Sequence, residues 1–190
     1  MKDEQIVRNY LDDVKRIADS FPMKDVIEAV AILYEVFLQG GIVYLCGNGG
    51  SASTASHFAN DLLKVGLSVN CLDDNLSMIT AITNDSGFSK LYTEQIEKRI
   101  TKYDALIVLS VHGGLGQDKA GVWSTNLTNA VEYAKIKGAK TIGLLGYDGG
   151  AIKHLATVSI IVGDSTPQVE SWHLHIEHLI CLLLKERMKK

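Results

Sequence analysis

The spacing of apolar residues changes along the chain, and these changes predict where helices and strands lie. Over residues 3–20 apolar residues recur at helical spacing, and a Phe-Pro pair ends the pattern. A second helical pattern covers residues 23–39 and stops at a Gly-Gly pair, which is typical of a helix C-terminus. The sequence therefore predicts two helices before the first strand. Their apolar stripes indicate packing on a core or contact between subunits.

From residue 42 onward, short apolar runs alternate with amphipathic segments. The pattern predicts strands at 42–46, 68–72, 105–109, 141–145 and 158–162, and helices at 51–64, 77–83, 88–100, 124–137, 151–155 and 169–188. The near-continuous apolar run Ala105–Leu109 is typical of a strand that is covered on both faces. This alternation predicts an α/β fold in one domain spanning residues 1–190. We expect a three-layer, doubly wound sheet of about five parallel strands flanked by helices, with the two N-terminal helices added.

Composition and charge narrow the functional classes. The 190 residues carry a net charge of −3 without a block of Lys and Arg, so nucleic acid is not an expected partner. No apolar stretch is long enough to span a bilayer, and the acidic first residues do not resemble a signal peptide. Cys46, Cys71 and Cys181 are odd in number and far apart, which predicts reduced thiols. We therefore expect a cytoplasmic protein with no membrane partner.

The chain is organised around a glycine-rich loop, Gly47-Asn48-Gly49-Gly50, that joins the first strand to a helix opening on Ser51. Glycines allow a tight turn and a close approach to a ligand, and the helix N-terminus favours an anion. Ser51 either caps the helix or donates to the same anion. The spacing matches neither the dinucleotide fingerprint nor the P-loop, so the loop predicts a phosphate site for a small molecule.

A second polar loop follows the strand at 105–109 and carries Ser110, His112 and, at the next helix start, Ser124. In a parallel sheet both loops lie at the same edge, so their hydroxyl and N–H groups converge as a sugar phosphate requires. The pair Asn84-Asp85 ends a short helix and is either a turn or a ligand contact.

Histidine and carboxylate residues form two further groups. His57 and Asp61 stand four residues apart and share a helix face. The last helix carries a larger set, namely Glu170, His173, His175, Glu177 and His178. Sets of this kind bind Zn²⁺ or act as acid/base pairs, and a structural role for the histidines is the alternative. Glu170 and His178 are about 12 Å apart along the helix, so a shared metal requires a suitable helix crossing.

Several segments resemble the sugar isomerase (SIS) domain of the phosphoheptose isomerases. They are Cys46–Ala52, the His57-Phe58-Ala59 run with its acidic residue at 61, Thr80–Phe88, Thr141–Gly150 and the last helix. The resemblance implies a homotetrameric ketose–aldose isomerase with active sites at subunit interfaces. Its reaction would convert sedoheptulose 7-phosphate to D-glycero-D-manno-heptose 7-phosphate for lipopolysaccharide or other surface glycans.

The same resemblance implies the roles of individual residues. Substrate contacts are implied for Asn48, Gly49, Gly50, Ser51, Asn84, Asp85, Ser110, His112, Ser124 and Glu170. A zinc ion is implied on His57, Asp61, Glu170 and His178. Asp61 and His178 are the implied acid/base pair.

Four departures from the family pattern suggest a variant subgroup. Asp61 replaces the usual Glu and is one methylene shorter, while Glu170 replaces Gln and adds a negative charge that favours a divalent cation. His112 stands where a phosphate-binding hydroxyl is usual, and an apparent insertion at 116–123 follows. We expect the insertion to act as a lid, with Lys119 as a further phosphate contact. Two alternatives therefore stay open, an isomerase or epimerase of another sugar phosphate and a non-catalytic SIS protein that binds or regulates.

Overall fold

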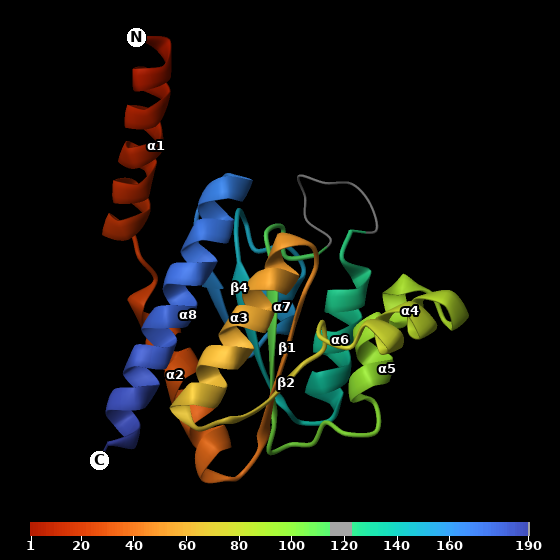
Figure 1. The fold of residues 1–190 in the computed structure, drawn as a ribbon. Helices are drawn as coiled ribbons and strands as arrows, with labels where there is room; N and C mark the ends of the chain where they lie inside the picture. The colour runs from red at the N-terminus through yellow and green to blue at the C-terminus, as the bar shows by residue number, and fades with distance from the viewer. Residues whose placement is uncertain (115–122, 190) are drawn as a thin grey trace.

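The computed structural model describes residues 1–114 and 123–189, and its elements follow the predicted alternation of strands and helices (Figure 1). In chain order these are α1 (Lys2–Asp19), α2 (Met23–Leu38), β1 (Ile42–Gly47), α3 (Gly50–Val65), β2 (Ser68–Cys71), α4 (Leu76–Asp85), the 3₁₀ helix η1 (Phe88–Lys90), α5 (Leu91–Ile96), β3 (Ala105–Ser110), α6 (Thr125–Ile136), β4 (Lys140–Leu145), α7 (Ile152–Leu155), β5 (Val158–Ile161) and α8 (Thr166–Met188).

The five strands form one parallel sheet in the order β2-β1-β3-β4-β5. The order reverses between β1 and β3, because the chain first moves outward to β2 and then returns to the other side of β1. Ligands of open parallel sheets bind at such a switch point, beyond the carboxyl ends of the strands. The predicted α/β fold is confirmed, and it brings the loops after β1 and β3 together.

Two apolar layers hold helices against the two faces of this sheet. In β1, Val43 and Leu45 belong to one layer, whereas Tyr44 and Cys46 belong to the other, as the strand period of two requires. The first layer includes buried residues of α2, α3 and α8, and the second includes residues of α5, α6 and α7. Helices α3 and α8 therefore lie on the same face, where they pack against each other (Figure 1).

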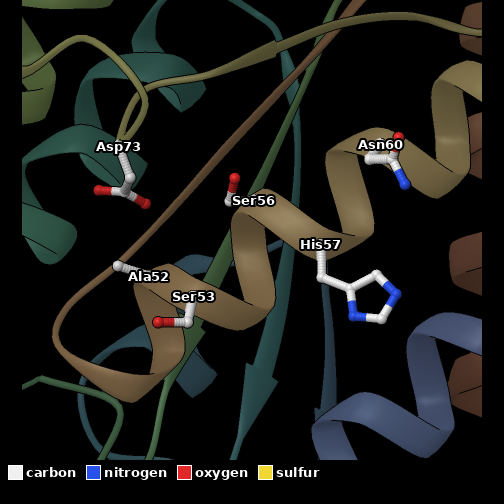
Figure 2. A pocket seen from close by; sticks show the side chains of 6 residues that line it. All are labelled: Ala52, Ser53, Ser56, His57, Asn60 and Asp73. Atoms are coloured by element: carbon white, nitrogen blue, oxygen red, sulfur yellow. The ribbon is translucent and has the colours of Figure 1, made fainter.

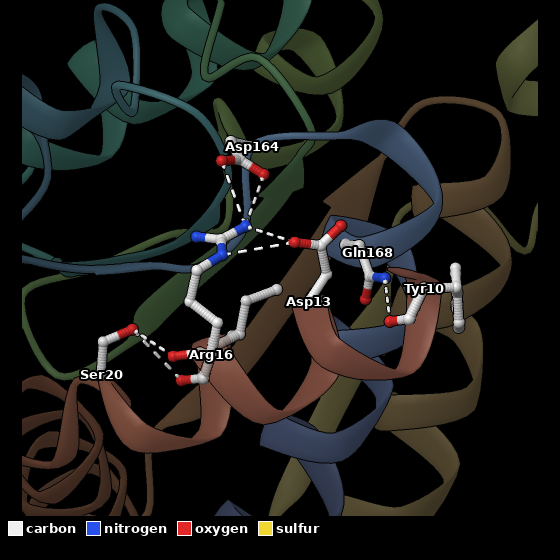
Figure 3. A network of polar contacts seen from close by, with 7 residues as sticks. Tyr10, Asp13, Arg16, Ser20, Asp164 and Gln168 are labelled. Carbon is white, nitrogen blue, oxygen red and sulfur yellow. Dashed lines mark hydrogen bonds and ion pairs between the residues drawn. The ribbon is translucent and has the colours of Figure 1, made fainter. Parts of the chain in front are cut away.

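Helix α1 extends beyond the body of the domain (Figure 1). Its one buried residue is Ile17, and Ile6, Val7 and Leu11 are each more than half exposed. Figure 3 shows the polar contacts at its C-terminal half: Arg16 Nη2 lies 3.1 Å from Asp164 Oδ1, and Gln168 donates to the Tyr10 carbonyl at 3.3 Å. These contacts join α1 to the start of α8 and leave an apolar stripe uncovered in this chain.

The observed elements differ from the predicted ones at two places. The predicted helix at 88–100 is divided into η1 and α5, and its last part is a turn. Helix α8 begins at Thr166, three residues earlier than predicted, because Pro167 fits the first turn of a helix. The predicted lid at 116–123, with Lys119, lies outside the described residues except for Trp123. Within the described ranges no helix is long and apolar enough to cross a membrane, and all three cysteines are free.

Candidate functional site

The glycine-rich loop needs glycine at two positions for different reasons. Gly49 has φ of +59°, a left-handed conformation that side chains rarely adopt. A Cβ on Gly47 would lie 2.6 Å from the backbone of Ser51, so only glycine allows this close approach. The N-cap of α3 is Gly49 rather than Ser51, and within the described chain no side chain caps the helix. The anion-binding end of α3 is therefore not occupied by a capping oxygen.

A cavity of about 120 Å³ lies between the loops after β1 and β3. Its lining includes six of the predicted substrate residues, namely Asn48, Ser51, Ser110, His112, Ser124 and Glu170. Ser124 is the N-cap of α6, and this helix too has no side-chain cap within the described residues. The start of α6 and the start of α3 thus border one small cavity. Its volume is that of on the order of four water molecules, which suits one phosphate group rather than a whole sugar.

Asn48 is fixed between two helices by its side-chain amide. Its Nδ2 donates to Ser124 Oγ at 3.3 Å and to Asn126 Oδ1 at 3.1 Å, and its Oδ1 accepts from Asn126 Nδ2 at 2.8 Å. The Tyr92 hydroxyl, from α5, reaches the same Oδ1 at 3.2 Å and also contacts the Gly47 carbonyl. This network holds the loop after β1 against the start of α6, so the cavity is preorganised.

Asp73, which follows β2, supports the same loop from the other side. Its Oδ2 accepts from the Gly47 N–H at 3.0 Å, and its Oδ1 accepts from the Tyr92 hydroxyl at 2.8 Å. Burial raises the pKa of Asp73 to about 6, and the two hydrogen bonds oppose this rise because they stabilise the carboxylate. Figure 2 shows Asp73 beside an open groove of about 620 Å³ that runs along α3 past Ser53 and His57.

Two turns into α3, a second polar group forms where α3 packs against α8. It consists of His57, Asp61, Glu177 and His178, and one ligand atom from each lies within 4.8 Å of the others. Asp61 Oδ2 is 3.5 Å from His57 Nε2 and 3.7 Å from His178 Nε2. Glu177 Oε1 is 3.5 Å from His57 Nδ1 and 3.7 Å from His178 Nε2. Each carboxylate is therefore adjacent to both imidazoles.

Burial makes the two carboxylates different. The side chain of Asp61 is 20% exposed, whereas that of Glu177 is fully buried. Burial raises the pKa of Glu177 to about 8, and the neighbouring charge of Asp61 adds to this rise. Neither carboxyl oxygen of Glu177 has a hydrogen-bond partner in the described part of the chain. A buried carboxylate without hydrogen bonds is costly, so this group is arranged for a cation or for a proton.

The comparisons with known proteins agree with this geometry. The family model described as SIS domain matches residues 9–146. The lincomycin biosynthesis protein LmbN of Streptomyces lincolnensis is 38% identical over 189 residues, which cover 93% of this chain and 68% of that protein. The phosphoheptose isomerase of Aliarcobacter butzleri is 34% identical, with 96% of this chain and 97% of that protein covered. The chain belongs to the SIS domain family.

A solved SIS structure agrees over nearly the whole fold. The phosphoheptose isomerase structure from Francisella tularensis has a TM-score of 0.86 and 26% identity, and 97% of each chain is covered. The start of α1 and all of α8 lie outside the matched family segment, whereas the structural match covers 97% of this chain. The small cavity and the His/carboxylate group of this SIS protein thus lie on a fold that it shares with phosphoheptose isomerases.

The structure brings together three of the four predicted zinc residues and separates the fourth. His57, Asp61 and His178 are adjacent, but Glu170 is not part of their group. Its carboxylate lines the small cavity instead, and a Cβ on Gly50 would lie 2.6 Å from its Oε1. The reason is the rise of α8, which separates residues 170 and 178 by about 12 Å along the axis. The fourth member of the group is Glu177. In the sequence, the one indication of this was that it stands next to His178.

Asn84 and Asp85 are not brought to the cavity in this chain. They end α4, which packs against η1 and α5, and they are exposed and bonded to each other at 2.8 Å. Gly49 is the N-cap of α3 and Gly50 its first residue, and neither lines the cavity. His112, which does line it, stacks on Tyr147 with ring centres 4.6 Å apart. The sequence did not single out Tyr92 and Asp73. They support the site through contacts between distant segments, which spacing along the sequence does not indicate.

Proposed function

We propose that this SIS protein is a phosphoheptose isomerase that converts sedoheptulose 7-phosphate to D-glycero-D-manno-heptose 7-phosphate. One observation carries the proposal: a single helix, α3, has an uncapped anion site at its first turn and a His/carboxylate group two turns later. The first site would bind the phosphate, and the second would face the carbonyl end of the sugar.

The spacing of the two sites fits a seven-carbon sugar. Ser51 and His57 are six residues apart, which is about 9 Å along a helix. Eight bonds separate C1 of sedoheptulose 7-phosphate from phosphorus. At the extended-chain rise of about 1.2 Å per bond they reach about 9–10 Å. A pentose phosphate is two bonds shorter, so it would leave C1 and C2 short of the second group.

In the proposed mechanism the reaction passes through a cis-enediol. Asp61 takes a proton from C1 while His178 donates one to the carbonyl oxygen at C2, which gives the enediol. Asp61 then returns its proton to C2, and His178 takes the proton of the C1 hydroxyl as the aldehyde forms. Both residues lie on the exposed side of their group, with His178 53% and Asp61 20% exposed, so a substrate can reach them. Their pairing at 3.7 Å allows acid and base to act on neighbouring atoms.

We further propose that the group binds Zn²⁺. His57, Asp61 and His178 offer two imidazoles and one carboxylate, a set that suits this ion and leaves its fourth position open for substrate. Zinc bonds of about 2.1 Å in a tetrahedron place neighbouring ligand atoms about 3.4 Å apart. Asp61 Oδ2 lies 3.5 Å from His57 Nε2 and 3.7 Å from His178 Nε2, so these two pairs would need little movement. A bound ion would polarise the substrate carbonyl.

We propose a cytoplasmic homotetramer in which residues 1–190 act as one SIS unit. The uncovered apolar stripe of α1 supports contact with another subunit, since three large apolar side chains there are more than half exposed. The position of Asn84 and Asp85, away from the cavity of their own chain, supports an active site completed by a neighbouring subunit. Light scattering and complementation between inactive variants would test this assembly.

The decisive experiment is a panel of sugar phosphates with and without a chelator, in which products are followed by NMR. Sedoheptulose 7-phosphate should be converted, and Asp61→Asn and His178→Gln should each lose at least a hundredfold in kcat. The matched controls Glu94→Gln and His154→Gln change exposed residues outside the site and should retain activity. Wild-type turnover in a folded Asp61→Asn protein would exclude the assigned base.

A second candidate is the isomerisation or epimerisation of a related sugar phosphate. It is favoured by the similarity to a lincomycin biosynthesis protein and by the carboxylate of Glu170 in the phosphate cavity. Product structures from the same panel separate the two reactions. Phosphate binding without turnover of any member would instead support a non-catalytic SIS protein.

A further inference from the structure

Glu177 is not among the residues that the family resemblance assigns to the site, yet it is the most buried member of the His/carboxylate group. Its side chain is fully buried, while those of His57 and His178 are 45% and 53% exposed. The four residues therefore do not form a flat patch. Three of them face the solvent side, and Glu177 lies beneath them.

Among the residues that the structure describes, few donors lie near Glu177. Its Oε1 is closest to His57 Nδ1 at 3.5 Å, and His178 Nε2 follows at 3.7 Å. Asp61 differs, because its Oδ1 already accepts from Lys64 Nζ at 3.1 Å and from Asn60 Nδ2 at 3.2 Å. Catalytic hydrogen bonds are often long in ligand-free structures and shorten when the site is occupied. The ring nitrogen nearest to the buried carboxylate is therefore Nδ1 of His57.

We propose that Glu177 is a positioning residue that accepts a hydrogen bond from the Nδ1–H of His57. With the proton on Nδ1, the Nε2 of His57 has a free lone pair, and this atom faces Asp61 Oδ2 at 3.5 Å. His57, Asp61 and His178 then present three donor atoms on the accessible side. Glu177 stays behind them as the carboxylate that fixes the ring.

This arrangement deepens the proposed function and rests on it for its catalytic consequence. A catalytic zinc site keeps a position open for substrate, and three protein ligands with a buried carboxylate behind them leave such a position. A carboxylate that accepts from the second ring nitrogen also fixes the tautomer and raises the basicity of the ligand. If Glu177 were itself the fourth ligand, the site would be closed.

The tautomer can be measured directly by ¹⁵N NMR of the metal-free protein, with the His57 signals assigned by their loss in His57→Gln. The measurement is made at pH 9, well above the ordinary pKa values of carboxyl groups and imidazoles. We expect the Nδ1–H tautomer of His57 in the wild type. Glu177→Gln, which keeps a carbonyl acceptor, should retain it, and Glu177→Leu should revert to the Nε2–H tautomer of free imidazole. Glu170→Gln is the matched control and should show the same His57 tautomer as the wild type.

Metal binding gives a second readout that does not depend on turnover. In chelator competition Glu177→Leu should bind Zn²⁺ about 10–100 times more weakly than the wild type. X-ray absorption should find the same number of protein ligands in both. The loss of one oxygen ligand in Glu177→Leu, or an Nε2–H tautomer in the wild type, would overturn the proposal. The wild-type tautomer alone decides the matter if Glu177→Leu does not fold. An inactive wild type with the expected tautomer would refute the isomerase and leave this inference intact.

Discussion

His173 gives a quantitative prediction about how pH controls stability. It lies on α8 three residues beyond Glu170, and its side chain is 1% exposed. Burial lowers its pKa from 6.5 to about 4, and a weaker interaction with the Leu145 backbone opposes this shift. Neither ring nitrogen makes a hydrogen bond to the described residues, so the ring is a neutral, buried imidazole.

The sign of the effect follows from where the proton binds. Because the folded pKa lies below the unfolded one, the unfolded chain binds more protons between pH 6.5 and pH 4. Stability from His173 is therefore present above pH 6.5 and is lost as pH falls toward 4. With these two pKa values the loss between pH 7 and pH 5 is about 2 kcal/mol. The raised pKa values of Asp73 and Glu177 act in the opposite direction, so the overall slope is not diagnostic.

The diagnostic quantity is a difference between two proteins. His173→Leu removes the titrating ring and replaces an unsatisfied polar group by an apolar one, so its stability at pH 7 should change little. Urea unfolding, followed by tryptophan fluorescence at one protein concentration, is measured at pH 7 and pH 5. We expect the variant to lose about 2 kcal/mol less than the wild type. The exposed His154→Leu is the control, and equal pH dependence of wild type and His173→Leu would refute the reasoning.

Three further predictions concern the small cavity and the contacts that hold the loop after β1. Glu170→Gln removes a negative charge from its wall, so isothermal titration should show at least tenfold tighter binding of inorganic phosphate, whereas weaker binding would contradict this placement of Glu170. Gly47→Ala forces a Cβ against the backbone of Ser51; urea unfolding should show a loss of about 1–3 kcal/mol, and unchanged stability would disprove the close approach. Tyr92→Phe removes the hydroxyl that donates to Asp73, so the carboxyl pKa of Asp73, measured by ¹³C NMR, should rise above 6, and an unchanged value would exclude the bond.

The fold, the glycine-rich loop and the pair His57 and Asp61 were predictable, because the signals for them are local in the sequence. Strand β1 ends where its apolar run stops, and the following glycines indicate a tight approach of backbone to ligand. The i, i+4 spacing of His57 and Asp61 places them on one face of α3 whatever α3 packs against. The same reasoning predicted the convergence of the loops after β1 and β3, since parallel strands end at one edge.

It was not predictable that Glu177, and not Glu170, would lie beside His57, because this depends on how α8 lies against α3. Helical spacing indicates which residues of α8 share a face, but the level at which His57 meets that helix is set by the packing of both helices on the sheet. Residues 177 and 178 lie at that level, whereas residue 170 lies about two turns away. The amino-acid sequence by itself determined the order of elements, the anion loop and one half of the His/carboxylate group. Only the tertiary structure decided which carboxylate completes it, since burial and contact between distant segments are properties of the packed chain.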